Sequence, residues 1–219
     1  MALFITFEGV EGSGKTTQIE RLKQYLVDQG ISCMITREPG GTPIGERVRK
    51  ILLNPEHHGM DPLTELLLYE AARVQHIREV LKPQLRKKTV ILCDRFDDAS
   101  VAYQGYGRKL DLSLVERSNR LATQGIRPNV TFLLDCPSHL GLGRALRRNR
   151  RLRQEKEGRF EKEKLQFHRR VRKGYLSIAK KEPHRVKVID TRQGSDKVFQ
   201  EIRRHLDIFL SKHKLLRSR

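Results

Sequence analysis

The sequence predicts an α/β fold: a five-stranded parallel sheet flanked by helices on both faces, with a basic lid. Five short β-prone runs recur along the 219 residues, and stretches with helical spacing of apolar residues separate them. Alternating strands and helices of this kind form parallel sheets with right-handed crossovers. We see no internal repeat or linker. We therefore expect one domain over residues 1–219, with the lid at about 147–159 and a basic tail at 212–219.

The first strand, loop and helix form a predicted phosphate-binding unit. Residues 3–7 are apolar and β-prone, residues 9–16 have the pattern Gly-x-x-x-x-Gly-Lys-Thr, and apolar residues then recur at helical spacing to Leu26. Glycines lack Cβ atoms, so several backbone N–H groups can converge on one anion, and the helix N-terminus adds its dipole. A glycine-rich turn that binds nothing is the alternative. The strand before and the helix after favour a nucleoside triphosphate site.

Four side chains near this loop suit phosphoryl chemistry. Lys15 supplies a point charge for the β and γ phosphates, and the Thr16 hydroxyl is placed to ligate Mg²⁺. Asp94 and Arg95 follow a buried strand that begins at residue 89. Ligands bind at the carboxyl ends of strands in open α/β sheets, so both charges should face the glycine loop. Asp94 would then hold Mg²⁺ or its water, and Arg95 would clamp a phosphate.

The other predicted elements follow the same two patterns of apolar residues. Gly30 and Gly125 follow helices as C-terminal signals, and Asp61-Pro62 precedes one as an N-terminal signal. In chain order we expect a strand at 31–36, helices at 44–53 and 63–85, a strand at 89–94, a helix at 110–124, a strand at 129–134, helices at 140–148 and 160–181, a strand at 185–190 and a helix at 195–210.

Three further places carry polar groups that a ligand would use. The loop at 37–43 contains two prolines and two glycines and presents an acid and a base, although a plain turn is the alternative. Arg73 lies in an apolar helix and needs an anionic or carbonyl partner, which a salt bridge to a local Glu would also supply. Ser100, Tyr103 and Gln104 lie along a helical turn that leads into a glycine-containing segment.

Residues 147–159 contain six arginines and one lysine. In a phosphoryl-transfer enzyme a mobile lid would close here and bring guanidinium groups onto the charge that develops during transfer. A solvated run of charge is the alternative for most of these residues.

Composition limits the class of protein. The formal charge is +19, from 45 Lys and Arg against 26 Asp and Glu, which suits polyanionic partners, so nucleic-acid binding is a rival interpretation. Aromatic residues make up 6% of the chain and include no Trp, which argues against a base-stacking platform.

Apolar runs are shorter than the roughly 18 residues of a membrane span and no leader is evident, so we expect a cytoplasmic protein. Cys33, Cys93 and Cys136 are expected as buried reduced thiols.

Six motifs together resemble those of bacterial thymidylate kinases over nearly the whole chain. In family order they are Phe7-Glu-Gly-Val-Glu-Gly-Ser-Gly-Lys-Thr-Thr17, Arg37-Glu-Pro-Gly-Gly-Thr42, Tyr69-x-x-x-Arg73-x-Gln75-His76, Asp94-Arg95-Phe96, Ser100-x-x-Tyr103-Gln-Gly105, and Arg159-Phe-Glu161 followed by Phe167 to Tyr175. The resemblance implies a P-loop kinase fold and transfer of the ATP γ-phosphoryl group to dTMP, giving dTDP and ADP, by a homodimer that needs Mg²⁺.

The resemblance also implies roles for individual residues. Tyr69 would stack on thymine, Arg73 would donate to its O4 carbonyl, and Tyr103 would crowd the 2′ position of the sugar. The expected catalytic residues are Lys15, Arg95, Glu11, Arg153 and Arg159, and the expected metal ligands are Thr16 and Asp94. ATP would be held by Gly9, Val10, Glu11, Gly12, Ser13, Gly14, Lys15, Thr16 and Thr17, and dTMP by Glu38, Pro39, Tyr69, Arg73, Arg95, Ser100, Tyr103 and Gln104.

Other activities stay open at this point. Another nucleoside monophosphate kinase is the nearest, although Tyr69, Arg73 and Tyr103 suit a pyrimidine deoxynucleotide. A nucleic-acid-binding P-loop ATPase would use the basic lid and tail, and DNA or RNA would stimulate its hydrolysis. A GTPase is disfavoured because the chain lacks an Asn-Lys-x-Asp motif.

The sequence departs from the thymidylate kinase pattern at two positions: Tyr69, where Phe is usual, and Gly158, where Asp is more common.

Overall fold

The computed structural model of the chain describes residues 2–87, 89–152 and 158–212. At its centre lies one parallel sheet with the strand order β2-β3-β1-β4-β5. The strands are β1 (Leu3–Glu8), β2 (Cys33–Arg37), β3 (Val90–Asp94), β4 (Val130–Asp135) and β5 (Val186–Asp190). The predicted five-stranded parallel sheet is thus confirmed.

The central strand β1 pairs with β3 on one side and with β4 on the other, with Ile5 opposite both Leu92 and Val130. The chain builds β2 and β3 on one side of β1 and then crosses over to build β4 and β5 on the other. Such a change of direction opens a crevice at the carboxyl ends of the central strands, which is where open α/β sheets bind ligands.

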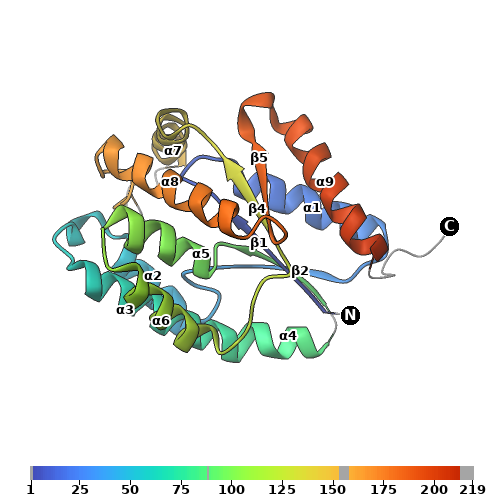
Figure 1. Cartoon of the computed structure of the whole chain (residues 1–219), viewed down its shortest axis with the longest axis horizontal. Helices are drawn as coiled ribbons and strands as arrows, with labels where there is room; N and C mark the ends of the chain where they lie inside the picture. The colour runs from blue at the N-terminus through green and yellow to red at the C-terminus, as the bar shows by residue number, and fades with distance from the viewer. Residues whose placement is uncertain (1, 88, 153–157, 213–219) are drawn as a thin grey trace.

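One face of the sheet is covered by α1 (Lys15–Asp28) and α9 (Ser195–Lys212), which lie side by side in Figure 1. Alternate residues of a strand face the same side, so Leu3, Ile5 and Phe7 of β1 point toward these helices. They share a buried cluster with Leu22 of α1 and Ile202 of α9. This packing fixes α1, and with it the glycine loop, against the sheet.

The other face is covered by a larger group of helices (Figure 1). Phe4 packs there against Ile77 and Leu81, while Val171 and Tyr175 belong to a neighbouring buried cluster. The elements of this side are α2 (Pro43–Leu53), the 3₁₀ turn η1 (Pro55–His57), α3 (Pro62–His76), the π-helical turn η2 (Ile77–Leu81), α4 (Lys82–Arg86), α5 (Asp97–Ser100), the π-helical segment η3 (Val101–Gly107), α6 (Leu112–Thr123) and α8 (Leu165–Lys181). A last 3₁₀ turn, η5 (Thr191–Gln193), follows β5.

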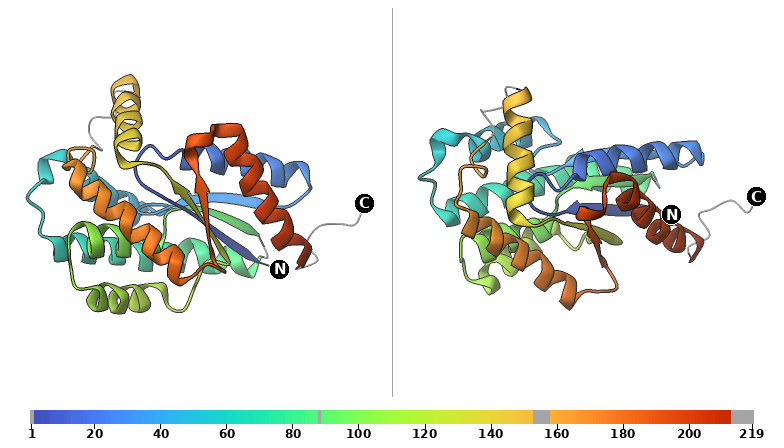
Figure 2. Two further views of the ribbon diagram at one scale, coloured as in Figure 1. Left: turned by 45° about the horizontal axis from the view of Figure 1, so that its top comes forward. Right: turned by 90° about the horizontal axis from the view of Figure 1, so that it is seen from above.

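Helix α7 (Ser138–Leu152) projects from the body of the molecule, as both views in Figure 2 show. The sequence predicted that this helix ends at Arg148, but it continues to Leu152. Arg is a strong helix former, and Arg150 and Arg151 lie in the last turn, where cations complement the helix dipole. Loss of apolar spacing therefore did not mark the end of the helix.

Two more predicted boundaries are wrong. The helix expected at 63–85 is divided by the π-helical turn η2, and Pro83 follows that turn in the first turn of α4. Proline has no N–H for an i−4 hydrogen bond, which accounts for a wider turn directly before it. The helix expected from Phe160 begins only at Leu165, because residues 159–163 form turns that bury Phe160.

The three thiols are free, and Cys93 and Cys136 are buried as expected. Cys33 is partly exposed because it starts β2, an edge strand. Among the described helices, none is both long and apolar enough to cross a bilayer.

Candidate functional site

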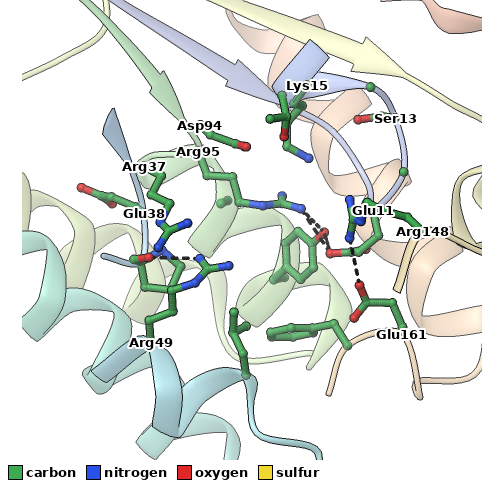
Figure 3. Close-up of a pocket in the computed structure, with 18 of the residues that line it drawn as sticks. Glu11, Ser13, Lys15, Arg37, Glu38, Arg49, Asp94, Arg95, Arg148 and Glu161 are labelled. Atoms are coloured by element: carbon green, nitrogen blue, oxygen red, sulfur yellow. Dashed lines mark hydrogen bonds and ion pairs between the residues drawn. The ribbon is translucent and has the colours of Figure 1, made fainter. Parts of the chain in front are cut away.

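A cavity of about 640 Å³ opens at the carboxyl ends of β1 and β3 (Figure 3). The glycine loop forms one wall, and residues from five other parts of the chain complete it. The lining residues are Glu11 to Thr17, Arg37 to Pro39, Arg49, Leu53, Tyr69, Asp94, Arg95, Ala99, Ser100, Tyr103, Gln104, Arg144, Arg148, Asn149, Arg151, Phe160 and Glu161.

The glycine loop has no room for larger residues at two positions. Gly9 and Gly12 have φ angles of +138° and +68°, which L side chains rarely adopt. A Cβ atom at Gly9 would lie 2.5 Å from the Leu134 carbonyl oxygen, and one at Gly12 would lie 2.1 Å from that of Gly141. The close approach lets the loop wrap around one end of the cavity. Helix α1 starts directly after it, so unpaired backbone N–H groups face that end.

Lys15 is buried at the base of this loop. Its Nζ donates to the carbonyl oxygens of Gly9 at 3.2 Å and Val10 at 3.4 Å. Burial, followed by the charge of Arg95, lowers the pKa of Lys15 to about 8. An anion bound between these two cations would offset both effects and keep the ammonium charged.

Thr16 and Asp94 line the cavity, and Asp94 lies beside Lys15 in Figure 3. Asp94 Oδ1 is buried and has no hydrogen-bond partner among the residues that the structure describes. A buried oxygen of this kind is costly unless it is satisfied, and Mg²⁺ prefers oxygen ligands, so the two residues fit this metal. The described residues contain no group of three or more His, Cys, Asp or Glu side chains that could hold a metal. A magnesium ion here would therefore take further ligands from phosphate oxygens and water.

Arg95 reaches across the middle of the cavity. Its backbone, at a φ of +73°, is tied to β1 by a hydrogen bond from its N–H to the Phe7 carbonyl at 3.0 Å. Its guanidinium donates to the Tyr175 hydroxyl at 2.8 Å, to the Tyr103 hydroxyl at 2.9 Å and to Glu11 Oε1 at 3.1 Å. Burial would lower the pKa of Arg95, but these three neighbours raise it well above its usual value. The group is a fixed, charged donor.

Glu11 holds this arrangement from the glycine loop. It accepts a hydrogen bond from the Tyr103 hydroxyl, and its Oε2 lies 3.3 Å from Nδ1 of the buried His168. Burial would raise the pKa of Glu11, but the contact with His168 and the charge of Arg95 hold it well below the usual range. Glu11 is therefore held as an anion beside Arg95 and His168. His168 lies within the quoted segment from Phe167 to Tyr175 but was given no role, because its contact with Glu11 arises only through the fold.

Seven of the eight residues expected to bind dTMP line the cavity together; these are Glu38, Pro39, Tyr69, Arg95, Ser100, Tyr103 and Gln104. The Tyr69 hydroxyl makes no hydrogen bond to any residue that the structure describes. Its ring packs against the buried cluster that contains Leu53 and Tyr103.

Arg73 is the exception: it is 1% exposed and does not line the cavity. Its Nε donates to Glu38 at 2.8 Å, its Nη1 to Glu70 at 2.6 Å and its Nη2 to the Phe96 carbonyl at 3.1 Å. The salt bridge to a local Glu, one of the two partners left open by the sequence, is present. The contact with a thymine carbonyl is not supported by this geometry, because all three guanidinium nitrogens already have protein partners.

Of the two lid arginines chosen from the sequence, Arg159 falls among the described residues and does not line the cavity. Arg153 lies outside the described residues. Arg159 is buried, pairs through Nη1 with Glu65 at 2.7 Å and donates through Nε to the Leu52 carbonyl. A buried carboxylate thus holds Arg159 away from the cavity, and the prediction of a catalytic role for it is not supported. Arg144, Arg148 and Arg151 of α7 line the cavity instead.

Two arginines on the Glu38 side of the cavity were given no role in the sequence analysis. In Figure 3, Arg37 and Arg49 lie beside Glu38, on the side of the cavity opposite Glu11 and Arg148. Arg49 donates to the Pro39 carbonyl at 3.1 Å. Arg37 was part of a quoted motif without an assigned role. Arg49 has no local signal that separates it from the other basic residues of α2.

Comparison with known proteins gives a consistent result. The profile of the thymidylate kinase family matches residues 7–202. A thymidylate kinase of Geotalea uraniireducens is 54% identical over 194 residues, which cover 89% of this chain and 91% of that protein. One from Syntrophotalea carbinolica is 52% identical over 202 residues, or 92% of this chain and 94% of the relative. The crystal structure of thymidylate kinase from Ehrlichia chaffeensis is similar with a TM-score of 0.75 and 38% identity, covering 94% of this chain and 98% of that one. This chain belongs to the thymidylate kinase family.

Proposed function

We propose that this protein transfers the γ-phosphoryl group of ATP to dTMP in the cytoplasm, giving dTDP and ADP. One observation carries the proposal: a triphosphate-type glycine loop and an acceptor wall with Tyr69, Arg95 and Tyr103 line the same cavity. The two substrates of a kinase must meet, and a shared cavity is the arrangement that lets them react. Membership of the thymidylate kinase family supports the same acceptor.

The donor would bind at the glycine loop. The backbone N–H groups of residues 11–17 and the ammonium of Lys15 would hold its phosphates. Thr16 and Asp94 would hold Mg²⁺, which supplies neutralisation of charge on the β and γ phosphates when it is bound. The lowered pKa of Lys15, caused by burial and by the charge of Arg95, would be offset by a bound anion.

The acceptor needs positioning rather than a strong base. A nucleoside monophosphate already carries a phosphate dianion, so its oxygen is the nucleophile without prior proton removal. Arg95 would clamp this phosphate, with Arg37 and Arg49 on the neighbouring wall. Glu11 and Tyr103 fix the Arg95 guanidinium. Tyr103 is also the group that would crowd a ribose 2′-hydroxyl.

We propose Arg148 as the lid arginine that acts on the transferred group. It lies within the range expected from the sequence, it lines the cavity, and its Nη2 is 3.6 Å from Glu161 (Figure 3). Its side chain is about half exposed, so it can move toward a bound triphosphate. Arg148→Ala should lower kcat by at least about tenfold, on the scale of lost electrostatic stabilisation. Unchanged kcat would move this role to another cavity arginine.

We also propose that two copies of the chain associate through α2 and α3. Five large apolar residues on these two neighbouring helices are between 37% and 55% exposed: Ile44, Ile51, Leu63, Leu67 and Val74. An apolar surface of this kind on adjacent helices is typical of an interface. Size-exclusion chromatography with light scattering should give a dimer, and Leu67→Glu should give a monomer. A monomeric parent protein would contradict the proposal.

The test of the activity is a coupled assay of ADP release with ATP, Mg²⁺ and one monophosphate at a time: dTMP, dUMP, dCMP, dGMP or UMP. The highest kcat/KM should be found with dTMP. Preference for another monophosphate would support a kinase activity but rule out dTMP as its acceptor. ATP hydrolysis that needs DNA or RNA, and no monophosphate, would replace the kinase with a nucleic-acid-stimulated ATPase.

A further inference from the structure

Glu65 in the first turn of α3 is buried, and the sequence analysis assigned it no role. Its carboxylate accepts hydrogen bonds from Gln104 Nε2 at 2.7 Å and from Arg108 Nη2 at 3.0 Å. Arg159 Nη1 lies 2.7 Å from the same group. Two guanidinium groups around one buried carboxylate stabilise its charged form. A charged carboxylate has acceptor oxygens only.

This contact settles which way the Gln104 amide faces. The carbonyl end of an amide cannot bond to a carboxylate, because both groups are acceptors. The nitrogen end must therefore face Glu65. Gln104 is 1% exposed and lines the cavity, and no residue in the described ranges donates to its Oε1. The oxygen is the end of the amide that is left for a ligand.

The neighbouring polar side chains Ser100 and Arg73 are already hydrogen-bonded to protein groups. Ser100 Oγ donates to Glu70 at 2.9 Å and accepts from Arg73 at 3.2 Å. Arg73 itself is satisfied by protein partners. The Gln104 oxygen is therefore an amide acceptor with free capacity near Tyr69, the residue assigned to stack on the base.

We propose that Glu65 is a specificity-determining positioning residue: it holds the Gln104 nitrogen, so that an acceptor oxygen faces the base and selects monophosphates that offer a ring N–H. Thymine and uracil carry such an N–H at N3, whereas N3 of cytosine is an acceptor. An acceptor facing an acceptor forms no hydrogen bond and leaves both groups desolvated, which disfavours cytosine. The inference rests on the proposed kinase activity.

The test is the ratio of kcat/KM for dTMP to kcat/KM for dCMP. Glu65→Gln places a neutral amide beside Gln104, which can donate to the Gln104 oxygen and let that amide turn round. The ratio should fall by about 10- to 100-fold, the scale of one well-placed hydrogen bond. Wild-type turnover of dTMP tests the proposed function, whereas only the change in the ratio tests Glu65.

Two further variants separate positioning from general damage. Glu163→Gln removes another carboxylate partner of Arg108 without touching Gln104, so its ratio should stay within about threefold of the parent ratio. The double variant Glu65→Gln with Gln104→Glu returns acceptor oxygens to the cavity side and should restore the preference for dTMP. A folded Glu65→Gln variant that loses both activities equally, with an unchanged ratio, would overturn the proposal.

Glu65→Gln leaves the buried Arg159 with a neutral partner and removes one of the two carboxylate partners of Arg108, so circular dichroism and a thermal melt must accompany the kinetics. If this variant does not fold, the double variant and Gln104→Leu carry the test. The double variant should prefer dTMP, and Gln104→Leu should lose most of the preference, since it removes the acceptor. A parent-like ratio in Gln104→Leu, or no preference in the double variant, would overturn the role of the held oxygen.

Discussion

The two walls of the cavity are built in different ways. The glycine-loop wall, residues 9–17, is one continuous stretch that presents mainly backbone groups to its ligand. The acceptor wall takes its side chains from four separate parts of the fold, through Glu38, Tyr69, Arg95, Tyr103 and Gln104. The first depends on glycine geometry, and the second depends on contacts between residues far apart in the sequence.

The difference extends to what lies behind each wall. Behind the glycine loop is the apolar packing of α1 and the sheet. Behind the acceptor wall lie buried ion pairs, with Arg73 between Glu38 and Glu70, and Glu65 beside Arg159. Buried ion pairs are costly to break because one partner is left charged and desolvated. Substitutions behind the acceptor wall should therefore affect stability, and substitutions in the glycine loop should affect catalysis.

The largest expected effect is on stability. Arg73→Met would leave Glu38 and Glu70 buried without their cation, and should lower the free energy of unfolding by about 3–5 kcal/mol. Urea denaturation measures this change. Arg37→Met is the matched control, because the Arg37 side chain is 51% exposed and its pair with Glu46 should contribute at most about 1 kcal/mol. Similar losses in the two variants would contradict the difference between buried and exposed pairs.

The second effect should be confined to the glycine-loop wall. Lys15→Met removes the cation that would face the transferred phosphate in the proposed reaction, and kcat should fall by about 10²- to 10³-fold. Calorimetric binding of dTMP should change little, because the acceptor wall is untouched. Lys23→Met, on the exposed side of α1, serves as the control with parent kinetics. Loss of dTMP binding in Lys15→Met would mean that the two walls do not act separately.

The third effect concerns Arg95, whose side chain lies between the two walls of the cavity. Arg95→Ala should reduce kcat/KM for dTMP by at least about a hundredfold, since a charge-assisted contact to the acceptor phosphate is lost. KM for ATP should change by much less. Steady-state kinetics with each substrate varied in turn measures both. A folded variant with unchanged kinetics for dTMP would remove Arg95 from the site.

The smallest effect is a dependence on pH. Lys15 is charged below its pKa of about 8 and neutral above it, so kcat/KM for ATP should fall as the pH rises past that value. The decline should approach about tenfold per pH unit. The residual activity of Lys15→Arg should lack this decline up to pH 10, because a guanidinium stays charged. An identical alkaline limb in that variant would assign the titration to another group.

The sequence was sufficient for the sheet and for the glycine-loop wall. Both are local patterns: strands and helices follow from periodic apolar residues, and the loop follows from a contiguous motif that includes Lys15. The motifs also identified seven residues that line the acceptor side. Glu38, Pro39 and Arg95 follow the ends of β2 and β3, where open sheets place their ligands, whereas the other four lie within α3, α5 and η3.

The sequence failed where a contact crosses the fold. Arg73 and Arg159 are both basic residues within motifs, yet their partners Glu38 and Glu65 lie 35 and 94 residues away along the chain. The pair of Arg73 with Glu70 is local and was one of the two partners that the sequence left open. No sequence pattern distinguishes the exposed Arg148 or the missed Arg49 from other solvated basic residues on helices. Glu65 was hidden for the same reason, since its partners lie 39, 43 and 94 residues further along the chain.

The central claim is that the two walls hold two nucleotides of one reaction at the same time. A bisubstrate analogue that joins adenosine and thymidine through a phosphate chain tests it most directly. The account predicts that this compound competes with both ATP and dTMP and binds once per chain. Competition with ATP alone, with dTMP still able to bind, would show that the acceptor lies elsewhere.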